Sequence, residues 1–217
     1  MRETLLNLVV YLPLVLLAVS AHEAAHAWTA FKCGDPTARV QGRVTLLPFV
    51  HVDLVGTLIL PGLLLAMGAP FLFGYAKPTP VNPGLLKSPK RDFSLVALAG
   101  PGANFALALA FAAVGVLVFR VFGIGASEIR LIVGAGIVVN VLLGWINLLP
   151  LPGFDGLKAI YALLPDEWCW RLQRGSRWLF PLLILALLFG WFNLALIPAF
   201  SLGSGLCAAA GAGQPPI

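Results

Sequence analysis

The chain has 217 residues, of which 59% are hydrophobic and only 11% are charged, and its formal net charge is +5. Soluble domains carry about 25% charged residues, because a globule of this size has a polar surface to cover. The composition therefore excludes a soluble domain, a disordered chain, a collagen and a coiled coil, and it indicates an integral membrane protein. The basic residues are scattered singly between apolar segments, which is typical of membrane orientation and argues against nucleic-acid binding. The three cysteines are odd in number and not spaced as CxxC, so neither a disulfide framework nor a Cys-based zinc site is predicted.

Five apolar segments reach the ~20 residues that a membrane-spanning helix needs. They lie at about residues 4–31, 54–74, 93–119, 130–150 and 178–200. The first could also be a secretory signal ending at Ser20-Ala21, but its apolar run continues to Phe31. We therefore predict an all-α polytopic membrane protein with about four to six transmembrane segments. Residues 1–217 would form a single domain, with a core over 4–156 and accessory C-terminal helices over 178–210.

Two stretches depart from the pattern of simple spanning helices. Segment 54–74 contains Pro61-Gly62 and Gly68-Ala69-Pro70, and helices do not run smoothly through such breaks. A re-entrant segment or a hairpin of half-helices is therefore an alternative to a single span. Residues 37–53 alternate apolar and polar side chains and include β-branched residues, which predicts a short interfacial β-ribbon.

The most informative motif is His22-Glu23-Ala24-Ala25-His26, an HExxH sequence in the second half of the first apolar segment. Positions i and i+4 share one helical face, so both imidazoles can reach one metal ion. Glu23 lies beside that face and can contact a zinc-bound water, whose pKa zinc lowers toward ~7. The structural alternative is two histidines that only hydrogen-bond neighbouring helices. Ionisable residues inside a membrane are expensive and are functional by default, which favours a metal site.

Two histidines and a water leave a catalytic zinc ion one protein ligand short. The candidates for this ligand are Asp35, His51, Asp53, Asp92, Glu128, Asp155, Asp166 and Glu167. Asp155 stands apart, because prolines and glycines break the helix around it and present its side chain at a fixed depth. Asp155 could instead be the N-cap of a helix over residues 157–164.

The motifs in their order along the chain resemble those of the site-2 protease family of intramembrane zinc metalloproteases. The resemblance pairs His22-Glu23-xx-His26 with the distant Asn147-xx-Pro150-x-Pro152-xx-Asp155-Gly156. Ala99-Gly100-Pro101-Gly102-Ala103-Asn104-Phe105 is similar to the family's central Gly-Pro-x-x-Asn segment. The turn at 34–37 and the segment Gly74-Tyr75-Ala76-Lys77-Pro78-x-Pro80-Val81-Asn82-Pro83 resemble a compact bacterial and archaeal subgroup without a PDZ or nucleotide-binding domain.

This resemblance implies a role for each matching residue. The implied ligands of one zinc ion per chain are His22, His26 and Asp155, and the implied general base is Glu23. The implied contacts with the substrate strand or the developing oxyanion are Asn104 and Asn147. Hydrogen bonds between helices are the alternative for both asparagines. The chain departs from the family where the usual Pro-Pro before Asp-Gly is replaced by Pro152-Gly153-Phe154, which would loosen that turn.

The implied activity is hydrolysis of peptide bonds within transmembrane segments of other membrane proteins, in a prokaryotic cell membrane. An extended substrate could pair with the edge of the predicted ribbon at 39–46. Two other functions remain open at this point, a membrane metal transporter or sensor and an inactive scaffold that binds membrane proteins. A transporter would place polar residues along several helices, whereas a scaffold would have no need of Glu23.

Charge and site geometry together predict the topology. If 54–74 crossed the membrane, five basic residues would lie on one side and nine on the other. If this segment returns to the face it entered, the division becomes eleven against three, which the positive-inside rule prefers. The HExxH motif and Asp155 lie near the C-terminal ends of their segments, so a shared metal requires those two helices to run in the same direction. We therefore predict a re-entrant 54–74, the N-terminus outside and the zinc nearer the cytosolic face.

Overall fold

The computed structural model describes residues 2–60, 63, 67, 74–151, 153–165, 167–169, 171 and 191–213. In this part of the chain the regular structure is helical and no β-strand occurs. Three helices are long and apolar enough to cross a membrane, at Val9–Lys32, Pro89–Val121 and Ser127–Leu148. The all-α polytopic prediction is therefore confirmed. Most of the predicted segment 178–200 lies outside the described residues.

The long helices are α1 (Arg2–Lys32), α4 (Pro89–Gly115), α5 (Ser127–Leu148) and α8 (Trp191–Ala210). Helix α4 continues through a π-helical turn, η4 (Val116–Val121). The short elements are α2 (Thr37–Val40), η1 (Pro48–Val50), η2 (Leu54–Ile59), η3 (Pro83–Leu85), α6 (Asp155–Ala159) and η5 (Ile160–Leu163).

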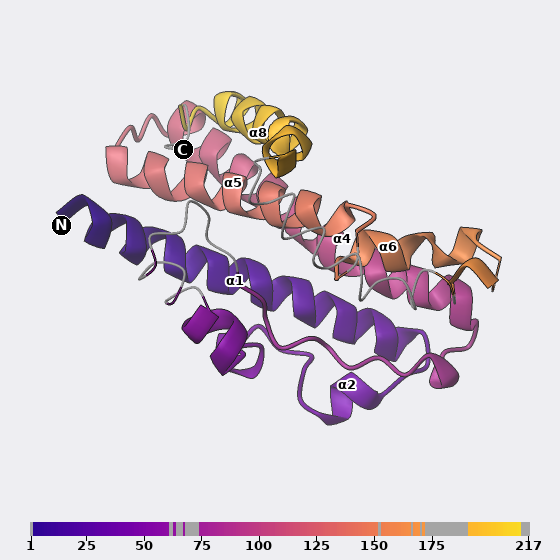
Figure 1. Cartoon of the computed structure of the whole chain (residues 1–217). Coiled ribbons are helices and arrows are strands. Elements are labelled where there is room, and N and C mark those ends of the chain that lie inside the picture. Colours follow the sequence, from indigo (N-terminus) through magenta and orange to yellow (C-terminus); the bar gives the residue numbers. More distant parts are fainter. Residues whose placement is uncertain are drawn as a thin grey trace.

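Helix α4 packs against both α1 and α5 and runs antiparallel to both (Figure 1). Along α1, Ala18 contacts Asn104 and His26 contacts Val96, so the contacts move backwards along α4 as they move forwards along α1. Asn104 also contacts Asn140 of α5, while the backbone of Gly144 lies against Pro101. Helices α1 and α5 therefore run in the same direction, as the argument from a shared metal requires.

The end of the bundle away from α6 has a tightly packed core formed by α4, α5 and α8. Ala108, Ile137 and Val141 are buried there, and so is Cys207. The ring of Phe111 lies directly on the backbone of Gly136, where a Cβ atom would overlap it. Small residues at such positions let apolar helices approach closely, and dispersion contacts then hold them together.

The predicted β-ribbon over 37–53 is wrong. The segment begins with one helical turn, α2, because the Asp35 carboxylate accepts a hydrogen bond from the Thr37 backbone N–H at 2.9 Å. Farther on, Arg43 donates to the Val50 carbonyl at 2.6 Å and the His51 ring hydrogen-bonds the Thr45 carbonyl at 2.9 Å. These side chains occupy backbone groups that a strand ladder would need, so local hydrogen bonds prevail over the alternating pattern. The predicted pairing surface at 39–46 is accordingly not a strand.

The two ends of segment 54–74 lie side by side. The Tyr75 backbone N–H donates to the Gly56 carbonyl at 3.1 Å, and the Thr57 hydroxyl donates to the Tyr75 carbonyl at 3.0 Å. A single crossing would separate such ends by about 30 Å. The contacts agree with a segment that returns to the face it entered. The proposed breaks at Pro61-Gly62 and Gly68-Ala69-Pro70 lie outside the described residues.

Candidate metal centre

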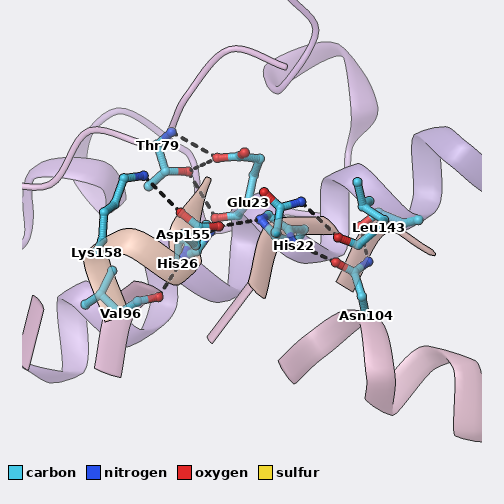
Figure 2. A network of polar contacts seen from close by, with 11 residues as sticks. His22, Glu23, His26, Thr79, Val96, Asn104, Leu143, Asp155 and Lys158 are labelled. Carbon is cyan, nitrogen blue, oxygen red and sulfur yellow. Dashed lines mark hydrogen bonds and ion pairs between the residues drawn. The ribbon is translucent and has the colours of Figure 1, made fainter. Parts of the chain in front are cut away.

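Three buried side chains converge where α1, α4 and α6 meet (Figure 2). His22 and His26 project from α1, and Asp155 is the first residue of α6. The Nε2 atom of each histidine lies 3.0 Å from Oδ2 of Asp155. Their candidate ligand atoms all lie within 4.8 Å of one another, close enough to hold one metal ion. In the described part of the chain this is the one group of three or more His, Cys, Asp or Glu residues with that property.

In each imidazole, the nitrogen that faces away from Asp155 is Nδ1, and it is hydrogen-bonded to a carbonyl oxygen. Nδ1 of His22 donates to the amide oxygen of Asn104 at 2.6 Å, and Nδ1 of His26 donates to the Val96 backbone carbonyl at 2.6 Å. Because a carbonyl oxygen can only accept, these contacts assign the ring hydrogen to Nδ1. The Nε2 lone pairs then face a carboxylate oxygen. Three acceptors turned toward one point repel one another unless a cation lies between them, so the donor set fits a zinc ion.

Where the two imidazole rings lie against α4, the helix has a glycine, Gly100, and therefore no side chain. A Cβ atom on Gly100 would overlap Nε2 of His26 and would lie 2.6 Å from Nε2 of His22. Gly156 has a comparable role beside Asp155, because a Cβ atom there would overlap the Leu148 carbonyl. Gly100 therefore leaves room for the two imidazoles, and Gly156 lets the start of α6 lie against the end of α5.

The two oxygens of the Asp155 carboxylate have different partners. Oδ2 faces the histidines, whereas Oδ1 accepts from the Lys158 ammonium group at 2.9 Å, one turn farther along α6. Lys158 is partly exposed, with 45% of its side-chain surface accessible. The ion pair turns the carboxylate so that a single oxygen faces the centre.

Glu23 lies beside this centre but is not one of its three converging residues. Its carboxylate is half-buried and contacts Thr79, which belongs to the extended segment after Gly74 (Figure 2). The helical spacing therefore separates two kinds of side chain on α1. His22 and His26 face α4 and Asp155, while the carboxylate of Glu23 faces Thr79.

The amide of Asn104 is used entirely inside the protein. Its oxygen accepts from His22, and its nitrogen donates to the Ala18 carbonyl at 3.0 Å and to the Asn140 side chain at 3.1 Å. Both asparagines are fully buried. These contacts leave no N–H group of Asn104 for a substrate oxygen. The sequence analysis missed Asn140, although an asparagine in an otherwise apolar stretch of α5 is a signal that could have found it.

The remaining sequence candidates have other partners. Asn147 is half-buried and donates to the Leu143 carbonyl at 2.9 Å. Asp53 accepts from the backbone N–H groups at the start of η2, and Asp92 accepts from the Ser88 N–H at 2.7 Å. Glu128 is exposed at the start of α5. Asp166 and Pro152 lie outside the described residues.

We predict that Asp155→Ala will lower zinc affinity strongly. Loss of a residue that merely supports a zinc ligand costs about 10–100-fold in affinity, so loss of a ligand should cost at least the upper end of that range. The measurement is a competition titration of the purified chain against a zinc-binding dye. Asp53→Ala, His51→Ala and Asp166→Ala are the controls and should bind zinc nearly as the wild type does. Full zinc affinity in Asp155→Ala, together with its loss in Asp53→Ala or His51→Ala, would move the third ligand to the loop after α1.

Comparison with known proteins places this centre in a family. The chain is 39% identical over 168 residues to the "Putative zinc metalloprotease YwhC" of Bacillus subtilis, covering 74% of this chain and 72% of that protein. It is 33% identical over 187 residues to the "Putative zinc metalloprotease Rip2" of Mycobacterium tuberculosis H37Rv, covering 82% and 67% of the two chains. No family model matches the chain, and no solved structure does. The extent of these two matches means that the chain belongs to the site-2 protease family of zinc metalloproteases.

Proposed function

We propose that the chain is an intramembrane zinc endopeptidase that hydrolyses peptide bonds within transmembrane segments of other membrane proteins. The observation that carries this proposal is the convergence of His22, His26 and Asp155 beside the carboxylate of Glu23. The cluster lies among helices apolar enough to cross a bilayer. A metalloprotease with its centre at that position would meet substrates inside the membrane.

His22, His26 and Asp155 would hold one zinc ion per chain. When bound there, zinc would polarise the scissile carbonyl and lower the pKa of an attacking water. Glu23 would take the proton from that water and pass it to the departing amine. Asn104 and the Val96 carbonyl would keep the two imidazoles in the neutral form that ligates through Nε2.

The role of Asn147 stays a proposal. Its nitrogen is used by Leu143, and its side chain is half-buried rather than enclosed. Its carbonyl oxygen could still accept from a backbone N–H of an extended substrate. Asn104 would instead act through His22, because both of its N–H groups already have partners inside the protein.

The substrate would be a transmembrane segment that can unwind. Carbonyl groups in an intact helix are already hydrogen-bonded, so water cannot reach them in the required geometry. Helix-breaking residues lower the cost of exposing a peptide bond in the bilayer. We therefore expect segments that contain Asn, Pro or Gly near the depth of the zinc to be cleaved faster than uniform Leu or Ala helices.

The proposal is tested with purified full-length protein reconstituted in lipid vesicles. The probe is a single-span reporter whose transmembrane segment carries Asn-Pro-Gly at its centre, and its control carries Leu-Leu-Leu there. Mass spectrometry of the products should place the cut inside the apolar segment, and chelation of zinc should stop it until zinc is restored. A cut only outside the apolar segment, or cleavage that survives complete zinc removal, would refute the proposed function.

The orientation in the membrane is also proposed, with the loops at 32–53, 77–91 and 158–177 on the cytosolic side and the loop at 123–128 on the opposite side. We predict that Ser127→Cys reacts with a membrane-impermeant thiol reagent in intact cells and that Ser88→Cys reacts only after the membrane is opened. Both serines are exposed; Ser88 directly precedes α4 and Ser127 is the first residue of α5, at opposite ends of the bundle. The experiment uses a background in which the three native cysteines are replaced. Labelling of Ser88→Cys from outside the cell would reverse the proposed orientation.

A further inference from the structure

An extended segment runs along α1 next to the candidate centre, and we call residues 75–82 the strap (Figure 1). Near its start, the Lys77 N–H donates to the His51 carbonyl at 2.8 Å. At its end, the Asn82 N–H donates to the fully buried carboxylate of Asp35 at 2.6 Å. Burial opposes ionisation of Asp35, but hydrogen bonds from Thr37 and Asn82 outweigh it and hold the pKa of this carboxyl below its usual range. The strap is therefore fixed on both sides of its middle.

Thr79, in the middle of the strap, contacts Glu23 through two different donors (Figure 2). Its backbone N–H lies 2.9 Å from Oε2 of Glu23, and its hydroxyl oxygen lies 2.7 Å from the same atom. The hydroxyl also lies 3.1 Å from the Glu23 backbone carbonyl. A hydroxyl has one hydrogen to donate, and the shorter distance favours the carboxylate. In the part of the chain that the structure describes, Oε1 has no hydrogen-bond donor.

The two flanking prolines explain why the N–H group of Thr79 has a fixed position. Pro80 restricts Thr79 to extended conformations, because an α conformation would clash with the proline ring. Pro78 and Pro80 have no N–H group, so the Thr79 N–H is the only backbone donor in this tripeptide. The tripeptide 78–80 therefore offers a single backbone N–H group, and this group donates to Glu23.

Glu23 needs such a partner because helix geometry alone does not aim it at the centre. With about 100° of rotation per residue, Glu23 lies roughly 60° around α1 from His26 and 100° from His22. Its side chain has several rotamers, and only some bring the carboxylate over the metal. If the Glu23 carboxylate is already fixed in a productive rotamer, the reaction does not have to bear the entropic cost of ordering it. Correct placement matters because a misplaced catalytic group lowers the rate steeply.

We propose that Thr79 is a positioning residue for Glu23. The Thr79 N–H and hydroxyl hold Oε2, and Oε1 is the oxygen that takes the proton from the attacking water. The assignment rests on the proposed function, because it requires Glu23 to be the general base. It also assigns a role to the segment 74–83. This segment resembles the compact subgroup of the family but contributes none of the three converging residues.

The contact itself is tested by hydrogen–deuterium exchange, without any substrate. Because Pro78 and Pro80 carry no amide hydrogen, a fragment that begins at Ala76 and ends at Pro80 reports Thr79 once its first two residues have lost their label. Glu23→Ala should speed exchange at Thr79 about tenfold or more, as expected for loss of a hydrogen bond to a charged acceptor. Exchange at Asn82, which bonds Asp35 instead, is the internal control and should not change.

The catalytic consequence is tested with three replacements of Thr79 and the vesicle reporter defined above. Thr79→Ser keeps both donors and should have a kcat within about twofold of the wild type. Thr79→Val loses the hydroxyl, and Thr79→Pro loses both donors while remaining compatible with an extended backbone. We expect kcat to fall about fivefold and then about fiftyfold, with zinc content and KM unchanged.

Each outcome decides the proposal. It is overturned if Glu23→Ala leaves Thr79 exchange unchanged, or if Thr79→Pro retains full zinc and a kcat within twofold of the wild type. It is also overturned if KM or zinc content changes in place of kcat, because Thr79 would then only support the fold. If Thr79→Pro fails to fold, the comparison of Thr79→Val with Thr79→Ser still decides the role of the hydroxyl. A wild type that does not cleave the vesicle reporter refutes the proposed function itself, whatever the exchange data show.

Discussion

Glu23→Gln should lose proteolysis and keep its zinc. The replacement preserves the size of the side chain and removes only its ability to take a proton. Glu23 does not belong to the group formed by His22, His26 and Asp155, so the ligand set stays complete. General acid–base catalysis contributes about 10²–10⁴-fold to the rate, and we expect a loss of that size in kcat. The measurement pairs turnover of the vesicle reporter with zinc content per chain.

The matched control is Glu128→Gln. This change also removes one carboxylate, but Glu128 is exposed at the start of α5, far along the bundle from the HExxH motif. It should leave both turnover and zinc content at the wild-type level. If Glu23→Gln loses zinc together with activity, Glu23 is a ligand and the division of roles on α1 is wrong. If it retains activity, the proton acceptor is a different group.

The sequence predicted the centre better than it predicted the surrounding chain. An HExxH motif defines two converging side chains from helical periodicity alone, without any tertiary information. The prolines and glycines around Asp155 distinguished it from the other candidates, but only the resemblance to a known family implied that this turn returns to α1. The structure places its carboxylate oxygen 3.0 Å from both imidazoles.

The predicted ribbon at 37–53 failed for a physical reason. An alternating pattern reports which side chains can share a face, but not which backbone groups will be taken by side chains. Asp35, Arg43 and His51 each occupy backbone groups nearby, and none of these partners is encoded by periodicity. That the two ends of segment 54–74 lie together was predictable, because it follows from counting charges and crossings, which are properties of the whole chain.

The residues that support the centre could not be predicted from the sequence, because their contacts join positions far apart in the chain. Thr79 and Glu23 are 56 positions apart, and Asn140 reaches His22 only through Asn104. Such contacts depend on how three helices and an extended segment pack together. A single sequence carries only weak traces of them, such as an isolated asparagine in an apolar helix.

Gly100→Ala should abolish zinc binding, whereas Gly102→Ala should not. Both glycines lie within one turn of α4, and alanine is favoured over glycine in a helix by about 0.8–1.0 kcal/mol. Gly102 is exposed and a Cβ atom there meets nothing within 4 Å, so Gly102→Ala should raise the melting temperature slightly and leave zinc and turnover unchanged.

At Gly100 the same added methyl group would overlap Nε2 of His26 and lie 2.6 Å from Nε2 of His22. Both ring nitrogens would have to leave their present positions, so two of the three candidate ligands would be displaced together. The replacement also gains helix propensity, so loss of the metal cannot be attributed to a weakened α4. Zinc content, turnover and the melting temperature of the zinc-free chains separate these effects. A Gly100→Ala protein with full zinc and normal turnover would mean that the imidazoles do not pack against α4 at Gly100, and the arrangement of the centre would be wrong.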